Sequence, residues 1–196
     1  VNLPENSEAL AELSQTGMAF PVSSYQTWFE TLPELTRAEM TDGPLAALQI
    51  RVRTAIDQSD LAQAEQLILA AVHDMEYVIE GAPIECPRGR REAPGHVQVH
   101  EGKLVLPGLR FGNILVAPQP VRGWAVNEEV LHANMSVPPP HQYLAFYRWL
   151  QTEFNPNAII HLGRHSTYEF LPGKRDGLHT TDYSRLNAGE IPALYP

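Results

Sequence analysis

The chain has one cysteine, Cys86, and it has no apolar run of the roughly 18 residues that would cross a membrane. A single cysteine excludes an intrachain disulfide, and no signal-peptide pattern is present, so we expect a protein of the reducing cytoplasm. Basic residues are also few, because 14 Lys and Arg stand against 23 Asp and Glu, for a formal net charge of -9. This balance argues against nucleic acid or an anionic membrane surface as a partner.

The phosphate-binding loop G-x-x-x-x-G-K-[ST] is missing too. The nearest stretch, Pro172-Gly173-Lys174, lacks both the upstream glycine and the following Ser or Thr. We therefore expect that this chain does not itself hydrolyse ATP. Internal repeats and low-complexity tracts are absent as well, and 196 residues suit one α/β domain or one and a half small ones.

Apolar residues at helical spacing characterise the N-terminal part of the chain, and we predict a helical segment over residues 1–81. Short helices are expected around Trp28, over 33–40 and over 45–56. The clearest one begins at the N-cap Asp60 and continues to residue 80, with an apolar stripe at spacings of three and four: Leu61, Ala64, Leu67, Ile68, Ala71, Val72, Met75, Val78 and Ile79.

Residues 96–196 are predicted to form an α/β segment after an Arg/Pro-rich loop at 82–95. A hairpin is expected over 96–106, with its turn at Glu101-Gly102, and a central strand over 109–117. A long proline-rich connection then leads to an amphipathic helix over 140–154 and a buried strand over 158–162. The expected fold class is therefore α/β: a helical N-terminal half followed by a mostly parallel sheet with a crossover helix and a β-hairpin. Gln119, Trp124, His161, His165 and Glu169 would gather where the two predicted strands end.

The stretch from His161 to Lys174 carries the densest chemistry of the chain. It reads His161-Leu162-Gly163-Arg164-His165-Ser166-Thr167-Tyr168-Glu169-Phe170-Leu171-Pro172-Gly173-Lys174. Two imidazoles, a carboxylate, a guanidinium and an ammonium in one loop after a strand are typical of an active site rather than of a packed core.

This stretch resembles the large, tetrapyrrole-binding subunits of the cobalt and magnesium chelatases. The shared pattern is a strand ending in His, then Gly-x-His, then Glu-aromatic-hydrophobic-Pro-Gly-Lys. Two further blocks match, one at 111–120 and one at Pro139-Pro140-His141. Members of that family are far longer than this chain, which begins at Val1, so we expect an excised fragment. The resemblance implies insertion of a divalent ion, cobalt or magnesium, into a porphyrin- or corrin-type ring, driven by separate AAA+ ATPase subunits.

The resemblance assigns His165 and Glu169 to the active site, as metal ligands and proton acceptors. A base must remove the two pyrrole protons while weak nitrogen and oxygen ligands present the ion. His161 is expected beside them as a further catalytic group. His141 is expected as a metal ligand, because the first turn of a helix keeps an imidazole neutral.

The anionic ring needs cationic and flat partners, for which the expected substrate-binding residues are Trp124, Arg164, Tyr168, Lys174 and Gln119. Trp124 either stacks on the macrocycle or fills the core. The arginines of the 82–95 loop either clamp the propionates or belong to a solvated connector. Ser166 and Tyr168 depart from the family pattern, which has Gly and Leu there. A tyrosine beside the site is able to ligate iron, so two alternatives stay open: a related dechelatase that removes iron from haem, and a non-catalytic porphyrin or metal carrier.

Overall fold

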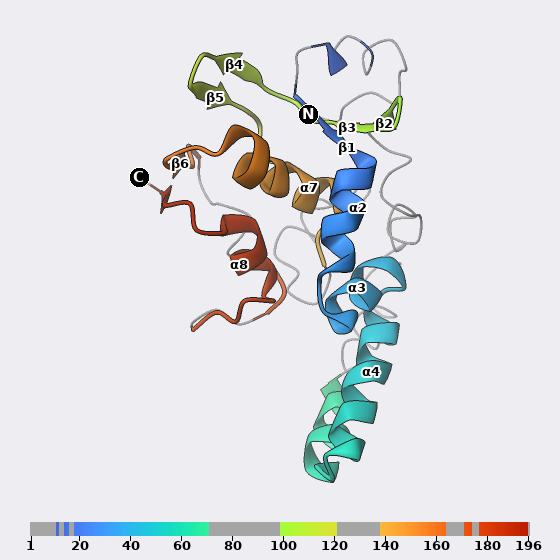
Figure 1. The fold of residues 1–196 in the computed structure, drawn as a ribbon. Helices are drawn as coiled ribbons and strands as arrows, with labels where there is room; N and C mark the ends of the chain where they lie inside the picture. Colours follow the sequence, from blue (N-terminus) through green and yellow to red (C-terminus); the bar gives the residue numbers. More distant parts are fainter. Residues whose placement is uncertain are drawn as a thin grey trace, which may run out of the picture.

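The computed structural model describes residues 11, 14–15, 18–70, 99–120, 138–163, 171–173 and 177–195. Three short helices follow the first strand: α2 (Val22–Glu30), α3 (Glu34–Thr41) and α4 (Pro44–Asp57). A further helix covers 61–70, and its N-cap is Asp60, whose carboxylate accepts a hydrogen bond of 3.0 Å from the Gln63 amide. In Figure 1, α4 extends away from the rest of the molecule. The prediction of a helical N-terminal half is confirmed.

A small antiparallel sheet packs against the start of α2. Its strands are β1 (Ala19–Pro21), β2 (Val99–His100) and β3 (Lys103–Val105), in the order β1-β3-β2. The turn between β2 and β3 is the predicted Glu101-Gly102, where both residues have positive φ, 46° and 72°. The expected hairpin is thus confirmed over residues 99–105, while residues 96–98 of the prediction lie outside the described residues.

The predicted central strand over 109–117 is wrong. These residues form a second hairpin, β4 (Leu109–Phe111) and β5 (Ile114–Val116). The reason is the Gly112-Asn113 turn, since glycine at the first turn position adopts a φ of 62°, as type II′ hairpins require. The apolar run on both sides of that turn concealed it.

Helix α7 (His141–Trp149) is the central helix, and eight of its nine residues are buried. It continues as the π-helical turn η2 (Leu150–Phe154), which ends at Asn155 in the left-handed conformation. Around α7 the core gathers large side chains from distant parts of the chain, among them Met18, Tyr25, Phe29, Leu104, Tyr143, Tyr147, Leu171 and Tyr183.

The C-terminal part contributes β6 (Ile159–Ile160), α8 (Tyr183–Ala188) and β7 (Ala193–Leu194). Within the described part of the chain, β6 and β7 are the sole parallel pair, because β1-β3-β2 and β4-β5 are antiparallel. The mixed α/β class is confirmed, but its sheets are small. The expected crossover is corrected: β5 and β6 flank α7 in the chain and yet lie in different sheets.

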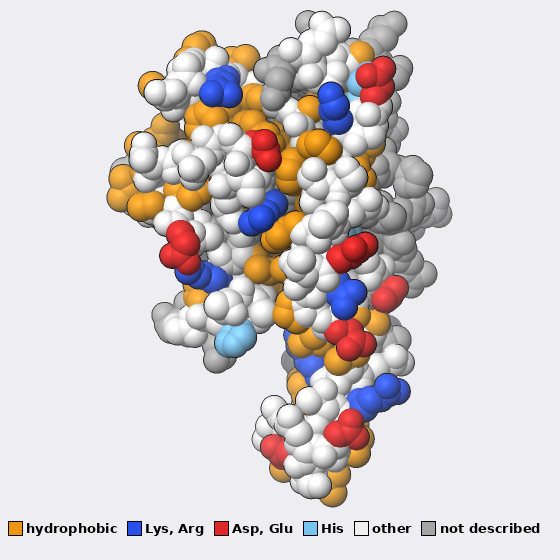
Figure 2. All heavy atoms as spheres, in the orientation of Figure 1, with side chains coloured by type: hydrophobic (Ala, Val, Ile, Leu, Met, Phe, Trp, Pro, Cys, Tyr) orange, Lys and Arg blue, Asp and Glu red, His pale blue; other side chains and the backbone are white. Residues whose placement is uncertain are grey.

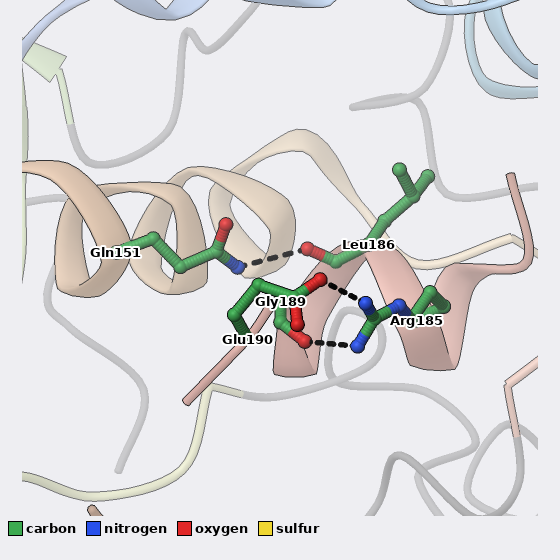
Figure 3. A network of polar contacts seen from close by, with 5 residues as sticks. All are labelled: Gln151, Arg185, Leu186, Gly189 and Glu190. Carbon is green, nitrogen blue, oxygen red and sulfur yellow. Dashed lines mark hydrogen bonds and ion pairs between the residues drawn. The ribbon is translucent and has the colours of Figure 1, made fainter. Parts of the chain in front are cut away.

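A network of polar contacts holds α8 against η2. Gln151 donates from Nε2 to the Leu186 carbonyl (2.9 Å), and Arg185 binds the Gly189 carbonyl and the Glu190 carboxylate (Figure 3). Gln151 Nε2 also donates to the Asn187 carbonyl at 2.8 Å. These contacts place the end of α8 so that β7 reaches β6. Among the residues described, no helix has the length and apolar composition needed to cross a bilayer.

Candidate functional site

Two described segments, called the first and second anchor, flank residues 164–170 in the sequence. Arg164, His165, Tyr168 and Glu169 lie outside the described residues, as do Lys174 and Trp124. The assignments of these six residues therefore stay predictions.

The first anchor is the end of β6. The amide of Ile159 donates to the Pro192 carbonyl and that of His161 to the Leu194 carbonyl, both at 2.8 Å, so parallel pairing with β7 fixes the backbone up to His161. Desolvation lowers the pKa of His161 below the ordinary value of 6.5. Its imidazole is therefore neutral at pH 7, the form that binds a metal or accepts a proton.

The second anchor is the turn at Leu171-Pro172-Gly173. Leu171 and Pro172 are buried, and Leu171 belongs to the core around α7. Gly173 has a φ of 118°, and a Cβ on it would lie 2.7 Å from Asp182 Oδ1. Asp182 precedes α8 and accepts a 2.7 Å hydrogen bond from the His179 amide. This part of the Pro-Gly-Lys motif therefore seats against the start of α8 and needs a glycine there.

His141 lies in the first turn of α7, as predicted, but inside the core. Its residue exposure is 0%, its Nδ1 lies 2.8 Å from the Tyr25 hydroxyl, and the Phe29 ring meets it edge-on at 4.9 Å. Desolvation lowers its pKa to about 4. The imidazole is thus neutral, as expected, although burial rather than the helix dipole is the cause.

The hydrogen bonds around His141 indicate which tautomer is present. If the Tyr25 hydroxyl donates to Nδ1, only the Nε2–H of His141 lacks a partner among the described residues. If Nδ1–H donates to the Tyr25 oxygen instead, both the phenol proton and Nε2 lack such partners. Because an unsatisfied buried polar group costs about 1–3 kcal/mol, the first arrangement is favoured. Nε2 then carries a proton and has no lone pair to give a metal. The metal-ligand role of His141 remains a prediction, and it requires the other tautomer.

Gln119 follows β5 and faces α7. Its Nε2 donates to the hydroxyls of Tyr143 (3.2 Å) and Tyr147 (3.1 Å), which lie one turn apart on that helix. Gln119 thereby ties the chain after the β4-β5 hairpin to α7. These two bonds do not test the predicted contact of Gln119 with a substrate, which stays a prediction.

Sequence reasoning missed Tyr25 and a second buried pair. Glu39 on α3 accepts a 2.8 Å hydrogen bond from the Tyr183 hydroxyl on α8, and its other oxygen lies 3.5 Å from Arg51. Helical periodicity does not identify Glu39 or Tyr183 as a polar residue of the core, because its partner lies far away in the sequence. In the residues that the structure describes, no group of three or more His, Cys, Asp or Glu is placed to hold a metal ion.

Comparison with known proteins extends the resemblance to nearly the whole chain. The model of the family described as CobN/Magnesium Chelatase matches residues 2–196. The aerobic cobaltochelatase subunit CobN of a Sinorhizobium species is 40% identical over 96 residues, covering 49% of this chain and 8% of that protein. A magnesium-chelatase subunit of Cereibacter sphaeroides is 28% identical over 183 residues, covering 90% of this chain and 15% of that protein.

A solved structure has a related fold. The catalytic subunit of cobaltochelatase from Mycobacterium tuberculosis superposes with a TM-score of 0.56 at 28% identity, covering 91% of this chain and 12% of that one. The chain therefore spans a small part of the length of each relative. Because the family model matches residues 2–196, the chain belongs to the CobN/magnesium chelatase family.

Proposed function

We propose that this chain supplies the tetrapyrrole-binding part of an ATP-dependent chelatase large subunit, which inserts cobalt or magnesium into a porphyrin- or corrin-type ring. The observation that carries the proposal is the family match across residues 2–196. Relatives named as cobaltochelatase and magnesium-chelatase subunits support cobalt and magnesium as the two candidate ions.

His165 and Glu169 are proposed as the pair that presents the ion and accepts the pyrrole protons. They are four residues apart, so one helical turn would place them side by side. The Gly-x-His and Glu-aromatic-hydrophobic-Pro-Gly-Lys motifs, which resemble those of the chelatase family, support this assignment. His161, neutral at the end of β6, is the proposed third group, and it would take part in proton transfer.

Cationic and aromatic side chains are proposed to hold the ring. Arg164 and Lys174 would meet its carboxylates, Arg164 as a planar fork and Lys174 as a point charge. Trp124 and Tyr168 would contact the macrocycle face, where stacking costs no hydrogen bonds. Gln119 is proposed to border the ring from the segment after β5.

ATP hydrolysis is proposed to come from AAA+ partner subunits. The sequence has no G-x-x-x-x-G-K-[ST] loop of its own. ATP hydrolysis in those partner subunits would supply the energy that dehydrates the ion and bends the ring.

The test uses the chain in two settings. Porphyrin titration of the chain, followed by fluorescence quenching, measures ring binding, and metallation is measured in a reconstituted chelatase that carries the same substitutions. His165→Ala and Glu169→Gln are expected to lower metallation about 100-fold or more while the ring affinity changes less than about threefold. His100→Ala and Glu153→Gln serve as matched controls on β2 and η2, and both should leave both measurements unchanged.

Two outcomes would replace the proposal. Ring binding without any effect of Glu169→Gln on metallation would favour a carrier. Haem binding with an absorption spectrum that changes in Tyr168→Phe would favour iron removal, since a phenolate ligand to Fe³⁺ has its own charge-transfer band.

A further inference from the structure

The β4-β5 hairpin presents a bare apolar face to solvent. Its register pairs Leu109 with Val116 and Phe111 with Ile114, so these four side chains point to the same side. They are 62%, 59%, 61% and 64% exposed, respectively. Figure 2 shows hydrophobic side chains gathered over this hairpin, at the upper left of the molecule.

The opposite face of the hairpin is seated on the protein. Leu115 packs against the core cluster, and the Arg110 guanidinium lies 5.3 Å from the centroid of the Phe154 ring. Arg110 Nε also donates to the Gly112 carbonyl at 3.0 Å. Because this side is fixed, the four apolar side chains are held outward as a defined surface.

Such a surface is unusual for an antiparallel hairpin in water. One face normally packs on the core while the other is polar. Here the outer face of the two described strands has no polar side chain, and it offers on the order of 400 Å² of apolar surface, comparable with the largest patch of a typical monomer, which is often functional.

We propose that this hairpin face packs against an apolar protein surface from the remainder of a chelatase large subunit. The matching part of the M. tuberculosis catalytic subunit is 12% of that chain, and the match in the C. sphaeroides protein is 15% of its length, so most of each relative lies outside the fold seen here. That remaining polypeptide is available to cover the hairpin in this family. The proposal rests on family membership and on the hairpin geometry, and it does not depend on metal insertion by His165 and Glu169.

Charge argues against a lipid surface as the occupant. Arg110, the cation on the hairpin, lies over Phe154 on the seated side. The chain as a whole carries a formal charge of -9, which an anionic bilayer would repel. An uncharged apolar face between protein segments fits these observations better.

The first experiment measures burial in the relative. A cysteine is placed in the M. tuberculosis protein at the position that superposes on Ile114, and its thiol labelling is followed by peptide mass spectrometry. Labelling in the folded protein is expected to be at least about tenfold slower than in urea, whereas Ile114→Cys in this chain, in a Cys86→Ser background, is labelled freely. Equally fast labelling in the folded relative would overturn the proposal.

The second experiment separates the other possible occupants. The chain and its Phe111→Ser, Ile114→Thr double variant are compared by analytical ultracentrifugation and by flotation with neutral and anionic phospholipid vesicles. Both proteins are expected to stay monomeric and unbound, with matching circular dichroism. A wild-type dimer that the double variant abolishes would assign the face to a second copy, and vesicle binding that it abolishes would assign it to lipid; either result would refute the proposal.

Discussion

The Tyr25 hydroxyl lies 2.8 Å from Nδ1 of His141, although 116 residues separate them. The two groups belong to α2 and α7, and both residues have 0% exposure. The contact therefore joins the helical N-terminal half to the central helix of the α/β half, and it sets the tautomer of a histidine from one of the family-like blocks.

Replacing Tyr25 with Phe removes that hydroxyl and leaves both nitrogens of a buried imidazole without partners among the described residues. We expect the free energy of unfolding to fall by about 1–3 kcal/mol, measured by urea denaturation at pH 7. Thr27→Ala on the exposed side of α2, where the hydroxyl bonds the Ser23 carbonyl of its own helix, should change it by less than about 0.5 kcal/mol. A Tyr25→Phe variant as stable as the wild type would show that the bond contributes nothing.

Acid should destabilise the protein through His141. Its pKa is about 4 in the folded state and 6.5 when exposed, so the unfolded state binds the extra proton and stability rises with pH across this window. The contribution is complete above pH 6.5 and is lost as the pH falls toward 4. We expect about 2 kcal/mol less stability at pH 5 than at pH 8 from this residue alone. His161, whose pKa is also lowered, acts in the same direction.

The measurement is a series of urea unfolding curves from pH 8 to pH 5. His141→Phe, which keeps a buried ring without a titrating group, should show a clearly flatter dependence on pH. Thr27→Ala on α2, which removes no titrating group, serves as the control and should keep the wild-type dependence. The same slope in His141→Phe and wild type would assign the acid sensitivity to other groups.

Local patterns account for much of the fold and little of the site. Periodicity located the helices around Trp28 and over 140–154, and the Glu101-Gly102 turn located one hairpin, because these signals depend on near neighbours in the chain. The Gly112-Asn113 turn was hidden within an apolar run. The pairing of β6 with β7 was not foreseen either, since a two-residue strand at 193–194 leaves no periodic signal.

The polar contacts of the core around α7 depend on pairs far apart in the sequence. Nothing near Tyr25 in the chain indicates that its hydroxyl meets His141, and nothing near Gln119 indicates two tyrosine partners. The neutral state of His141 was predicted correctly, but for the wrong physical cause. Only the packed core supplies the desolvation that lowers its pKa to about 4.

Gly173→Ala should disturb the anchor after the candidate loop. The alanine would have to adopt the glycine φ of 118°, and its Cβ would lie 2.7 Å from Asp182 Oδ1, so the turn or the start of α8 must shift. We expect a loss of about 2–4 kcal/mol in the free energy of unfolding, together with weaker porphyrin binding. Gly177→Ala is the matched control, because its φ is 60° but no described atom lies within 4 Å of the added Cβ. Strain alone should cost that variant about 1 kcal/mol, and equal losses in the two variants would contradict the contact with Asp182.

Glu39 should stabilise the contact between α3 and α8. Burial, and then the negative charge of Glu39, raise the pKa of Tyr183, so its hydroxyl keeps its proton and donates at 2.8 Å. Glu39→Ala leaves that buried phenol without its acceptor and removes the partner of Arg51, for an expected loss of about 2–3 kcal/mol. Tyr183→Phe alone leaves a buried carboxylate that still faces Arg51, so its cost should be smaller than that of Glu39→Ala.

In a double-mutant cycle read by urea denaturation, the two substitutions should couple by about 1 kcal/mol or more, whereas Glu34→Ala on the exposed start of α3 should add independently. Strict additivity of Glu39→Ala and Tyr183→Phe would mean that the hydrogen bond does not hold these helices together.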